Sequence, residues 1–286
     1  MRKNFNKIMK IIGAISVLAL FVLIILFYRF STPKSDQKIA EEFNELGIDI
    51  SISYQQFKDF KYRVIKPQKE IDTTLTTIVF IHGSIGSAMD FKKYLSDSAL
   101  NIRANLIAYD RIGYGVNQTG DVQESIAFEV EMVEEAIGNI NKKNTILVGY
   151  SYGGPIALAS KKKYKKIVLL APAVYSKVEP LPWALNMYKW KATRWLLPAV
   201  WKAASKEKLS HKEDLKNFEN DWNFTPSNII SIHGTEDWIV PFENSEYLNK
   251  IFSSKQFELV TLNDAGHGLV WTHFKEIKNS ILQQLN

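Results

Sequence analysis

Short apolar runs alternate with amphipathic stretches along most of this chain. Residues 48–54 alternate apolar and polar side chains with period two, which is typical of a half-buried strand, and residues 60–66 resemble its antiparallel neighbour. Six more apolar runs predict buried strands at 76–81, 105–109, 144–149, 166–171, 229–232 and 257–262. Helices are predicted over 90–100, 121–141, 155–164 and 271–285. This alternation predicts an α/β domain with a mostly parallel eight-stranded sheet and helices on both faces.

Segment 175–227 interrupts this alternation, because it lies between two predicted strands and is far too long for a turn. It contains five of the seven tryptophans, and its apolar side chains follow a helical stripe: Trp183, Met187, Trp190, Leu197 and Trp201. We therefore predict a helical lid inserted over a site. Trp183, Trp190 and Trp195 are its candidate substrate contacts, which favours an apolar acyl or aryl substrate. The alternative is that the tryptophans form the lid's own core.

The N-terminal segment is apolar on all sides. Residues 11–28 carry no charge, and their number is near the ~20 that a bilayer core requires. Four basic residues precede this run, whereas acids and bases mix after it, so we expect a cytoplasmic N-terminus and an extracytoplasmic domain. The bulky residues at the end of the run favour an uncleaved signal anchor over a cleaved signal peptide. The predicted divisions are a basic segment and transmembrane anchor at 1–30, a polar tether at 31–47 and a domain at 48–286.

Charge is concentrated in two places. The formal net charge is +6, but residues 1–30 alone carry +5. The rest of the chain therefore carries only +1 and lacks the excess of basic residues typical of nucleic-acid-binding proteins. Residues 176–212 of the lid carry +6, which fits either contact with anionic lipid headgroups or a solvated face. The chain has no cysteine, which excludes disulfides, thiolate chemistry and cysteine-based zinc sites.

One serine lies on a predicted sharp bend. Strand 144–149 runs into helix 155–164 with no room for a loop, and Ser151 lies between Gly149 and Gly153. We expect both glycines to be required because a β-carbon there would collide with the neighbouring strand and helix. A serine hydroxyl is a weak nucleophile until a base removes its proton. The remaining chain must therefore supply a base, an orienting acid and an oxyanion site.

Five motifs fall in order at the predicted strand ends, where the sites of parallel sheets lie. They are His82-Gly83, Asp110-Arg111-x-Gly113-x-Gly115, Gly149-Tyr150-Ser151-Tyr152-Gly153-Gly154, His233-Gly234-Thr235-Glu236-Asp237-x-x-Val240-Pro241 and Ala265-Gly266-His267. With these motifs, the chain from about residue 48 to its end resembles the α/β-hydrolase superfamily. The resemblance implies the α/β-hydrolase fold, with a cap where segment 175–227 lies.

The resemblance also implies roles for individual residues. The family's chain order of nucleophile, acid and histidine falls on Ser151, Asp237 and His267. The backbone N–H groups of Ser84 and Tyr152 would form the oxyanion hole. The implied activity is that of a serine hydrolase of the carboxylesterase or lipase type, with a small-molecule or lipid-like ester as substrate. This chemistry requires no cofactor and no metal.

Other histidines are rivals for the role of base. His233 also follows a strand, but it precedes the acid by only four residues, and we expect it to be structural. We expect His82 to shape the oxyanion turn. No motif surrounds His211 or His273, so both are predicted to lie at the surface.

Acidic residues also offer alternatives. Glu236 and Asp264 are rivals of Asp237, which is preferred because the residues around it match the family spacing. Asp110 and Arg111 are predicted to form an ion pair with one another in a structural turn.

Several functions remain open. The same triad serves a C–C bond hydrolase, an acyltransferase or a cofactor-free peroxidase, because fold does not determine function. A non-catalytic ligand-binding module is the alternative from another class. The sequence does not indicate an oligomeric state.

Overall fold

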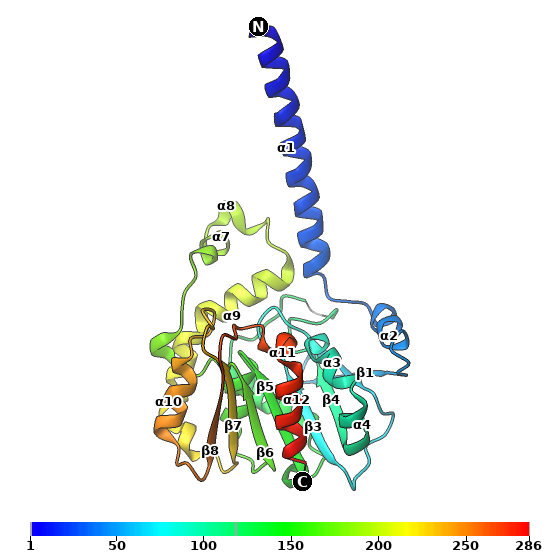
Figure 1. Ribbon diagram of the computed structural model, residues 1–286, viewed down its shortest axis with the longest axis vertical. Coiled ribbons are helices and arrows are strands. Elements are labelled where there is room, and N and C mark those ends of the chain that lie inside the picture. The colour runs from blue at the N-terminus through cyan, green and yellow to red at the C-terminus, as the bar shows by residue number, and fades with distance from the viewer. Residues whose placement is uncertain (1, 118, 286) are drawn as a thin grey trace.

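The computed structural model describes residues 2–117 and 119–285, and an eight-stranded sheet lies at its centre (Figure 1). The order across the sheet is β1-β2-β4-β3-β5-β6-β7-β8, and β2 runs antiparallel to both of its neighbours while the pairs from β4 to β8 are parallel. The predicted mostly parallel sheet is confirmed. The strands are β1 (Ser51–Phe57), β2 (Phe60–Lys66), β3 (Thr76–Ile81), β4 (Ala104–Tyr109), β5 (Thr145–Tyr150), β6 (Lys166–Leu170), β7 (Ile229–Gly234) and β8 (Phe257–Leu262).

Helices cover both faces of this sheet, as parallel strands require. Every residue of β3, β4, β5 and β7 is buried, whereas the edge strands β1 and β8 are partly exposed. One apolar cluster contains side chains of α5 (Ile126–Ala136), α6 (Gly153–Ala159) and α10 (Glu243–Ile251). The cluster on the other face includes residues of α2 (Asp36–Asn44), α3 (Lys92–Leu95), α4 (Ser98–Arg103), α11 (Leu269–Thr272) and α12 (Phe274–Gln283).

All four predicted helices are shorter or more broken than their sequence pattern indicated, and the one predicted at 155–164 ends at Ala159. The stretch 90–100 is divided among a 3-10 turn at Ala88–Phe91, α3 and α4, because the Asp97 side chain accepts the Leu100 N–H at 3.1 Å and starts a new helix. The stretch 121–141 is helical only in α5, which Ser125 caps. The closing helix is divided between α11 and α12.

The segment 31–47 is packed on the domain, where the sequence pattern predicted a polar tether. Its helix α2 buries Ile39 and Phe43 completely in the core. Arg63 of β2 holds the start of α2 with hydrogen bonds of 2.8 Å to the carbonyl of Lys34 and to the Asp36 carboxylate. Two apolar residues four positions apart are enough to dock one face of a short helix. The polar composition concealed this pair.

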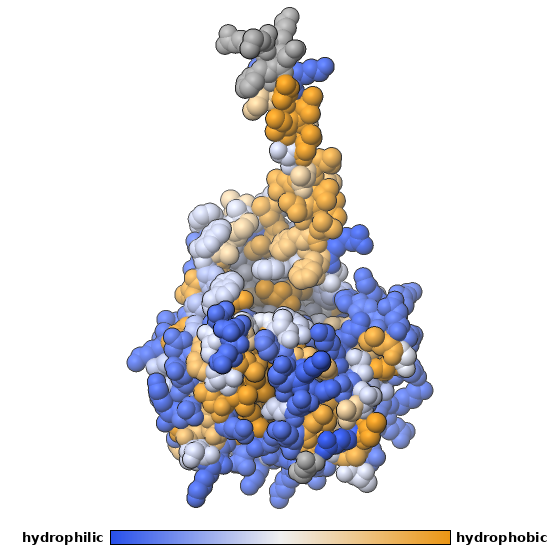
Figure 2. Space-filling model, viewed as in Figure 1, coloured by the Kyte–Doolittle hydropathy of each residue, from blue (hydrophilic) through white to orange (hydrophobic). Residues whose placement is uncertain are grey.

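Helix α1 (Arg2–Ser31) projects from the domain, and its residues 6–26 are exposed (Figure 1). Within residues 2–117 and 119–285, α1 is the one helix long and apolar enough to cross a membrane, over Asn6–Ser31. In the surface view, apolar side chains cover α1 down to the domain (Figure 2). The C-terminus lies at the opposite end of the domain from α1 (Figure 1).

The chain between β6 and β7 forms a helical cap. It contains 3-10 turns at Ser176–Val178, Trp183–Leu185 and Glu219–Phe224, and the helices α7 (Asn186–Lys189), α8 (Lys191–Arg194) and α9 (Ala199–Lys216). The predicted continuous helical stripe from Trp183 to Trp201 is wrong, because Trp190 has extended backbone angles and Pro198 starts a new helix. The cap tip, residues 181–197, lies on the same side of the domain as α1 (Figure 1).

Candidate active site

Ser151 lies on a strained turn between β5 and α6. Its φ of +54° is in the left-handed region, which costs a non-glycine residue about 1–3 kcal/mol. Two backbone hydrogen bonds of 2.9 Å hold the turn, from Ser151 N–H to the Leu170 carbonyl and from Gly154 N–H to the Ser151 carbonyl. A β-carbon at Gly149 would collide with the start of α6, and one at Gly153 with the end of β3. The predicted need for both glycines is confirmed.

His267 follows β8 and reaches the serine. Its Nε2 lies 3.0 Å from the Ser151 Oγ, although the two residues are 116 positions apart. The imidazole stacks on the Tyr150 ring with centroids 5.2 Å apart, and the Tyr150 hydroxyl donates to the His267 carbonyl at 2.9 Å. Tyr150, the residue before Ser151, therefore holds His267 in place.

Asp237 follows β7 and orients the histidine. Its Oδ2 lies 2.7 Å from Nδ1 of His267, and its Oδ1 accepts the N–H groups of Ile239 and Val240 at 3.0 and 2.8 Å. A proton on Nδ1 leaves Nε2 as the acceptor that faces Ser151. Burial on its own would raise the pKa of Asp237, but hydrogen bonds from His233 and His267 outweigh it and lower the pKa well below its usual range.

The other residues considered for the roles of base and acid lie in different positions. His233 is fully buried, with Nδ1 2.7 Å from the Ser245 hydroxyl and Nε2 2.9 Å from the Val240 carbonyl. It braces the turn that carries Asp237. Glu236 and Asp264 are exposed, while Asp237 is the carboxylate that contacts His267.

The turn after β3 lies against Ser151. A β-carbon at Gly83 would lie 2.7 Å from Cβ of Ser151 and 3.3 Å from its Oγ, so glycine permits this approach. Ser84 follows directly, and Tyr152 caps the N-terminal end of α6. Of the two predicted oxyanion donors, Tyr152 thus comes directly after Ser151, and Ser84 comes directly after the glycine that approaches it.

His82 fixes the shape of this turn. Its Nε2 accepts the Arg111 N–H at 2.9 Å, so Nδ1 carries the proton and donates to the Gly83 carbonyl at 2.7 Å. Burial, and secondly the charge of Arg111, lower the pKa of His82 to about 3. His82 is thus a neutral structural residue at physiological pH, in keeping with the role expected for it.

Glu207 on α9 joins the cap to the turn after β3, and no motif drew attention to it. It is fully buried, and its carboxylate accepts from the Ser84 hydroxyl and from the Tyr114 hydroxyl, the latter at 2.6 Å. It also pairs with Arg111, which contacts Glu129 at 3.1 Å. One signal was present: Glu207 is one of two acids among the basic residues of segment 176–212.

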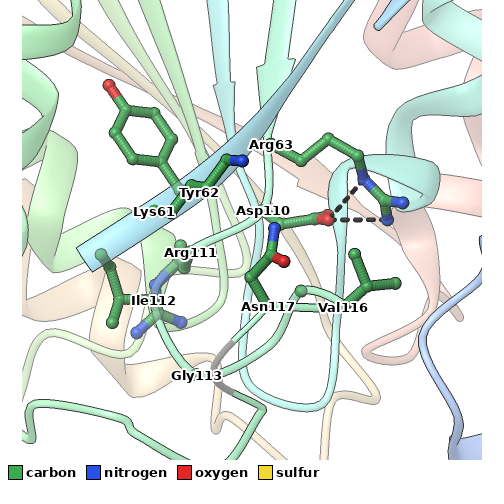
Figure 3. A pocket seen from close by; sticks show the side chains of 10 residues that line it. Lys61, Tyr62, Arg63, Asp110, Arg111, Ile112, Gly113, Val116 and Asn117 are labelled. Carbon is green, nitrogen blue, oxygen red and sulfur yellow. Dashed lines mark hydrogen bonds and ion pairs between the residues drawn. The ribbon is translucent and has the colours of Figure 1, made fainter. Parts of the chain in front are cut away.

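Asp110 and Arg111 do not pair with one another, and that prediction is wrong. Asp110 pairs with Arg63 at 2.7 Å, beside a cavity of about 10 Å³. The Arg111 side chain points away from the Asp110 carboxylate (Figure 3). Arg111 instead pairs with Glu129 and Glu207. Neighbouring residues that leave a strand point to opposite sides of it, which separates the two charges.

His211 is another correction, because it is buried and not at the surface. Its Nε2 donates to the Ala173 carbonyl at 2.9 Å, and its ring lies 4.5 Å from that of Tyr152. Burial lowers its pKa to about 3. Trp222, likewise buried, donates from Nε1 to the Val174 carbonyl at 3.0 Å. Both residues attach the cap to the domain near Ser151.

The three lid tryptophans predicted to contact substrate lie elsewhere. Trp183, Trp190 and Trp195 are 80%, 61% and 69% exposed. They belong to the cap tip, which extends away from the strand ends (Figure 1). The structure does not bring them together with Ser151.

Comparisons with known proteins agree with this architecture. Residues 78–277 match the sequence model of the alpha/beta hydrolase family. A rice protein (Oryza sativa subsp. japonica) named as a probable 1-acylglycerol-3-phosphate O-acyltransferase is 27% identical over 163 residues, which cover 54% of this chain and 34% of the rice protein. The chain thus spans about a third of that relative's length.

Solved structures resemble the chain in fold. An alpha/beta hydrolase fold protein from Burkholderia ambifaria has a TM-score of 0.64 at 16% identity, covering 81% of this chain and 97% of that one. A membrane phospholipase A, described as a bacterial virulence factor, has a TM-score of 0.60 at 14% identity over 96% of this chain and 98% of its own. The thioesterase domain from the curacin biosynthetic pathway has a TM-score of 0.60 at 12% identity over 82% of this chain and 99% of its own.

Proposed function

Because this chain belongs to the alpha/beta hydrolase family, we propose that it is a membrane-anchored serine hydrolase that cleaves ester-type bonds through an acyl-enzyme. The observation that carries the proposal is the hydrogen-bonded chain of Ser151, His267 and Asp237. Its two links measure 3.0 and 2.7 Å, and its three residues come from the ends of three strands.

The chemistry proceeds in two steps. The Ser151 Oγ attacks the carbonyl carbon of the ester while Nε2 of His267 takes the hydroxyl proton. The tetrahedral intermediate collapses, the C–O bond to the leaving alcohol breaks, and the alcohol takes the proton from His267. Water then attacks the acyl-serine with the same proton path in reverse roles, which releases the acid. Asp237 keeps the imidazole in the required tautomer and stabilises the imidazolium.

The oxyanion of each intermediate would accept hydrogen bonds from the backbone N–H groups of Ser84 and Tyr152. Loss of one such donor typically costs about 100- to 1,000-fold in turnover. Glu207 holds the Ser84 side chain and His82 holds the turn before it. The donors are therefore fixed before the substrate arrives.

The proposed substrate is a lipid-like ester with an apolar acyl or aryl group. Helix α1 supports this, because an enzyme tethered to a bilayer meets lipids at high local concentration. The likeness in fold to a membrane phospholipase A is consistent with the same class.

We propose that α1 is an uncleaved anchor with its N-terminus in the cytoplasm. The last turns of α1 contact the cap: the Phe27 and Trp201 rings lie 5.2 Å apart, and Nε1 of Trp201 donates to the Ser31 Oγ at 2.8 Å. Cleavage before Ser31 would remove part of this contact. Because the chain lacks cysteine, Lys10→Cys and Lys255→Cys can be labelled from outside intact cells with an impermeant maleimide. Labelling of the Lys10→Cys variant alone would contradict the proposed orientation and place the N-terminus outside the cell.

Acyl transfer is the second candidate, and the rice relative favours it. An alcohol acceptor would replace water in the second step, with the same proton transfers.

One substrate experiment distinguishes hydrolysis from acyl transfer. The full chain in detergent is given esters with short to long acyl groups, with and without a lysophospholipid acceptor, and Ser151→Ala is the control. Free acid as the main product in both conditions supports hydrolysis. Acylated acceptor as the main product would instead support acyl transfer and contradict hydrolysis as the main activity. No turnover of any ester would contradict both.

A further inference from the structure

The cap is divided into an anchored base and an exposed tip. Helix α9 is held to the domain by the buried side chains of Glu207 and His211. The tip, residues 181–197, is tied mostly to itself: Thr193 donates to the Met187 carbonyl at 2.8 Å, and Nε1 of Trp195 donates to the Ala192 carbonyl at 2.9 Å. A segment so attached keeps a defined shape while it presents its outer side chains.

Those outer side chains are unusual for a surface in contact with water. Trp183, Trp190 and Trp195 are all more than half exposed, and so is Leu181. The tip has three basic residues (Lys189, Lys191 and Arg194) and no acid. Exposed aromatic groups mark contact surfaces, and tryptophan together with basic residues is typical of the boundary between lipid headgroups and acyl chains.

The position of the tip along α1 indicates which partner its exposed side chains meet. The Tyr28 hydroxyl donates to the Leu196 carbonyl at 3.0 Å, so the end of the tip lies level with Tyr28. Arg29 is the first charge after the apolar run of α1, and it marks the level where a spanning helix would meet the headgroups. From this contact the tip rises along α1 in the direction of the N-terminus (Figure 1). The tip helices α7 and α8 thus lie at or above the headgroup level, with Trp190 between them and Trp195 at the end of α8.

We infer that the cap tip docks into the headgroup region of the same bilayer that α1 crosses. The inference rests on the proposed anchor, and it turns the cap side of the active site toward the membrane. In that arrangement an ester reaches Ser151 from the bilayer rather than from bulk water.

The absence of cysteine allows a direct test in the full chain. Single variants Trp183→Cys, Trp195→Cys and Leu18→Cys carry an environment-sensitive fluorophore, and the chain is reconstituted into nanodiscs with anionic lipid. Ile102→Cys on α4 is the matched control, because Ile102 is a 76% exposed apolar residue at the other end of the domain. Two lipids are then used in separate samples, one with a quencher just below the headgroups and one with a quencher at the end of the acyl chain, because Leu18 would lie about 16 Å deeper than Arg29.

The expected result is loss of fluorescence at positions 18, 183 and 195 and none at 102. Quenching at position 18 without quenching at 183 and 195 would overturn the docking and leave the anchor intact. No quenching at position 18 would overturn the anchor, and the docking with it. Quenching at all four positions would also overturn the docking, because it would show contact without a defined orientation.

Discussion

The strand ends and the cap hold their functional residues in different ways. Ser151, Asp237 and His267 follow β5, β7 and β8, so the backbone of the sheet places them within 3.0 Å of their partners. The cap is instead fixed by buried side chains, chiefly Glu207, whose partners lie about 100 residues away in sequence. Changes at the strand ends should therefore alter chemistry with little effect on folding, whereas changes in the cap base should alter both.

Asp237→Asn is expected to have the largest effect. The asparagine would favour the wrong tautomer of His267, and the corresponding change in such a triad lowers turnover about 10,000-fold. Steady-state kinetics with a soluble ester measure it. Asp264→Asn is the matched control, since Asp264 is an exposed acid of the next loop. Equal losses in both variants would contradict the assignment of the acid.

Glu207→Gln should have an intermediate effect, because it acts on the reaction through Ser84. We expect kcat to fall roughly tenfold to a hundredfold, less than the loss of a direct donor, with little change in KM. Glu213→Gln on the same helix removes an exposed carboxylate and should change neither constant. A loss of thermal stability with unchanged kcat would reduce Glu207 to a purely structural residue.

His211 makes the attachment of the cap sensitive to pH. Its pKa is about 3 in the folded chain, mainly because of burial, so between about pH 3 and the ordinary pKa of 6.5 the unfolded state binds up to one proton more. Stability from this group is present above pH 6.5 and is lost as pH falls, by about 2 kcal/mol at pH 5. His211→Gln should flatten that part of the dependence in thermal unfolding of the detergent-solubilised chain. An unchanged slope would contradict the buried neutral histidine.

The smallest effect is expected at the cap tip. Replacing Trp183, Trp190 and Trp195 by serine should raise KM for a lipid ester in bilayers about tenfold, equivalent to about 1.4 kcal/mol of lost interaction. Hydrolysis of a short soluble ester should not change. Ile102→Ser is the control. A similar loss with both substrates would place these tryptophans in the active site after all.

The same comparison explains what the sequence could predict. Each triad residue lies next to a strand end and has local companions, such as Gly149 and Gly153 around Ser151, whose spacing the backbone geometry demands. The bounds of central strands follow from the same local patterns, as for β3, which is predicted at 76–81 and spans Thr76–Ile81. These features can be predicted from the sequence because they depend on near neighbours along the chain.

The cap shows why the rest could not be predicted. Glu207 and His211 look like ordinary residues of a polar helix, and only tertiary packing buries them. The tryptophan stripe has helical spacing, but the chain breaks at Trp190 and Pro198, and burial then differs from one tryptophan to the next. Trp222 is buried whereas Trp183 is exposed, and no local pattern distinguishes them.

Covalent labelling of Ser151 is the most direct test of the proposed triad. A fluorophosphonate forms a stable adduct only with a serine that a neighbouring base activates. We predict one adduct per chain, which mass spectrometry locates on Ser151, and none in Ser151→Ala. Folded full-length protein that stays unlabelled, or that is labelled at another serine, would contradict it.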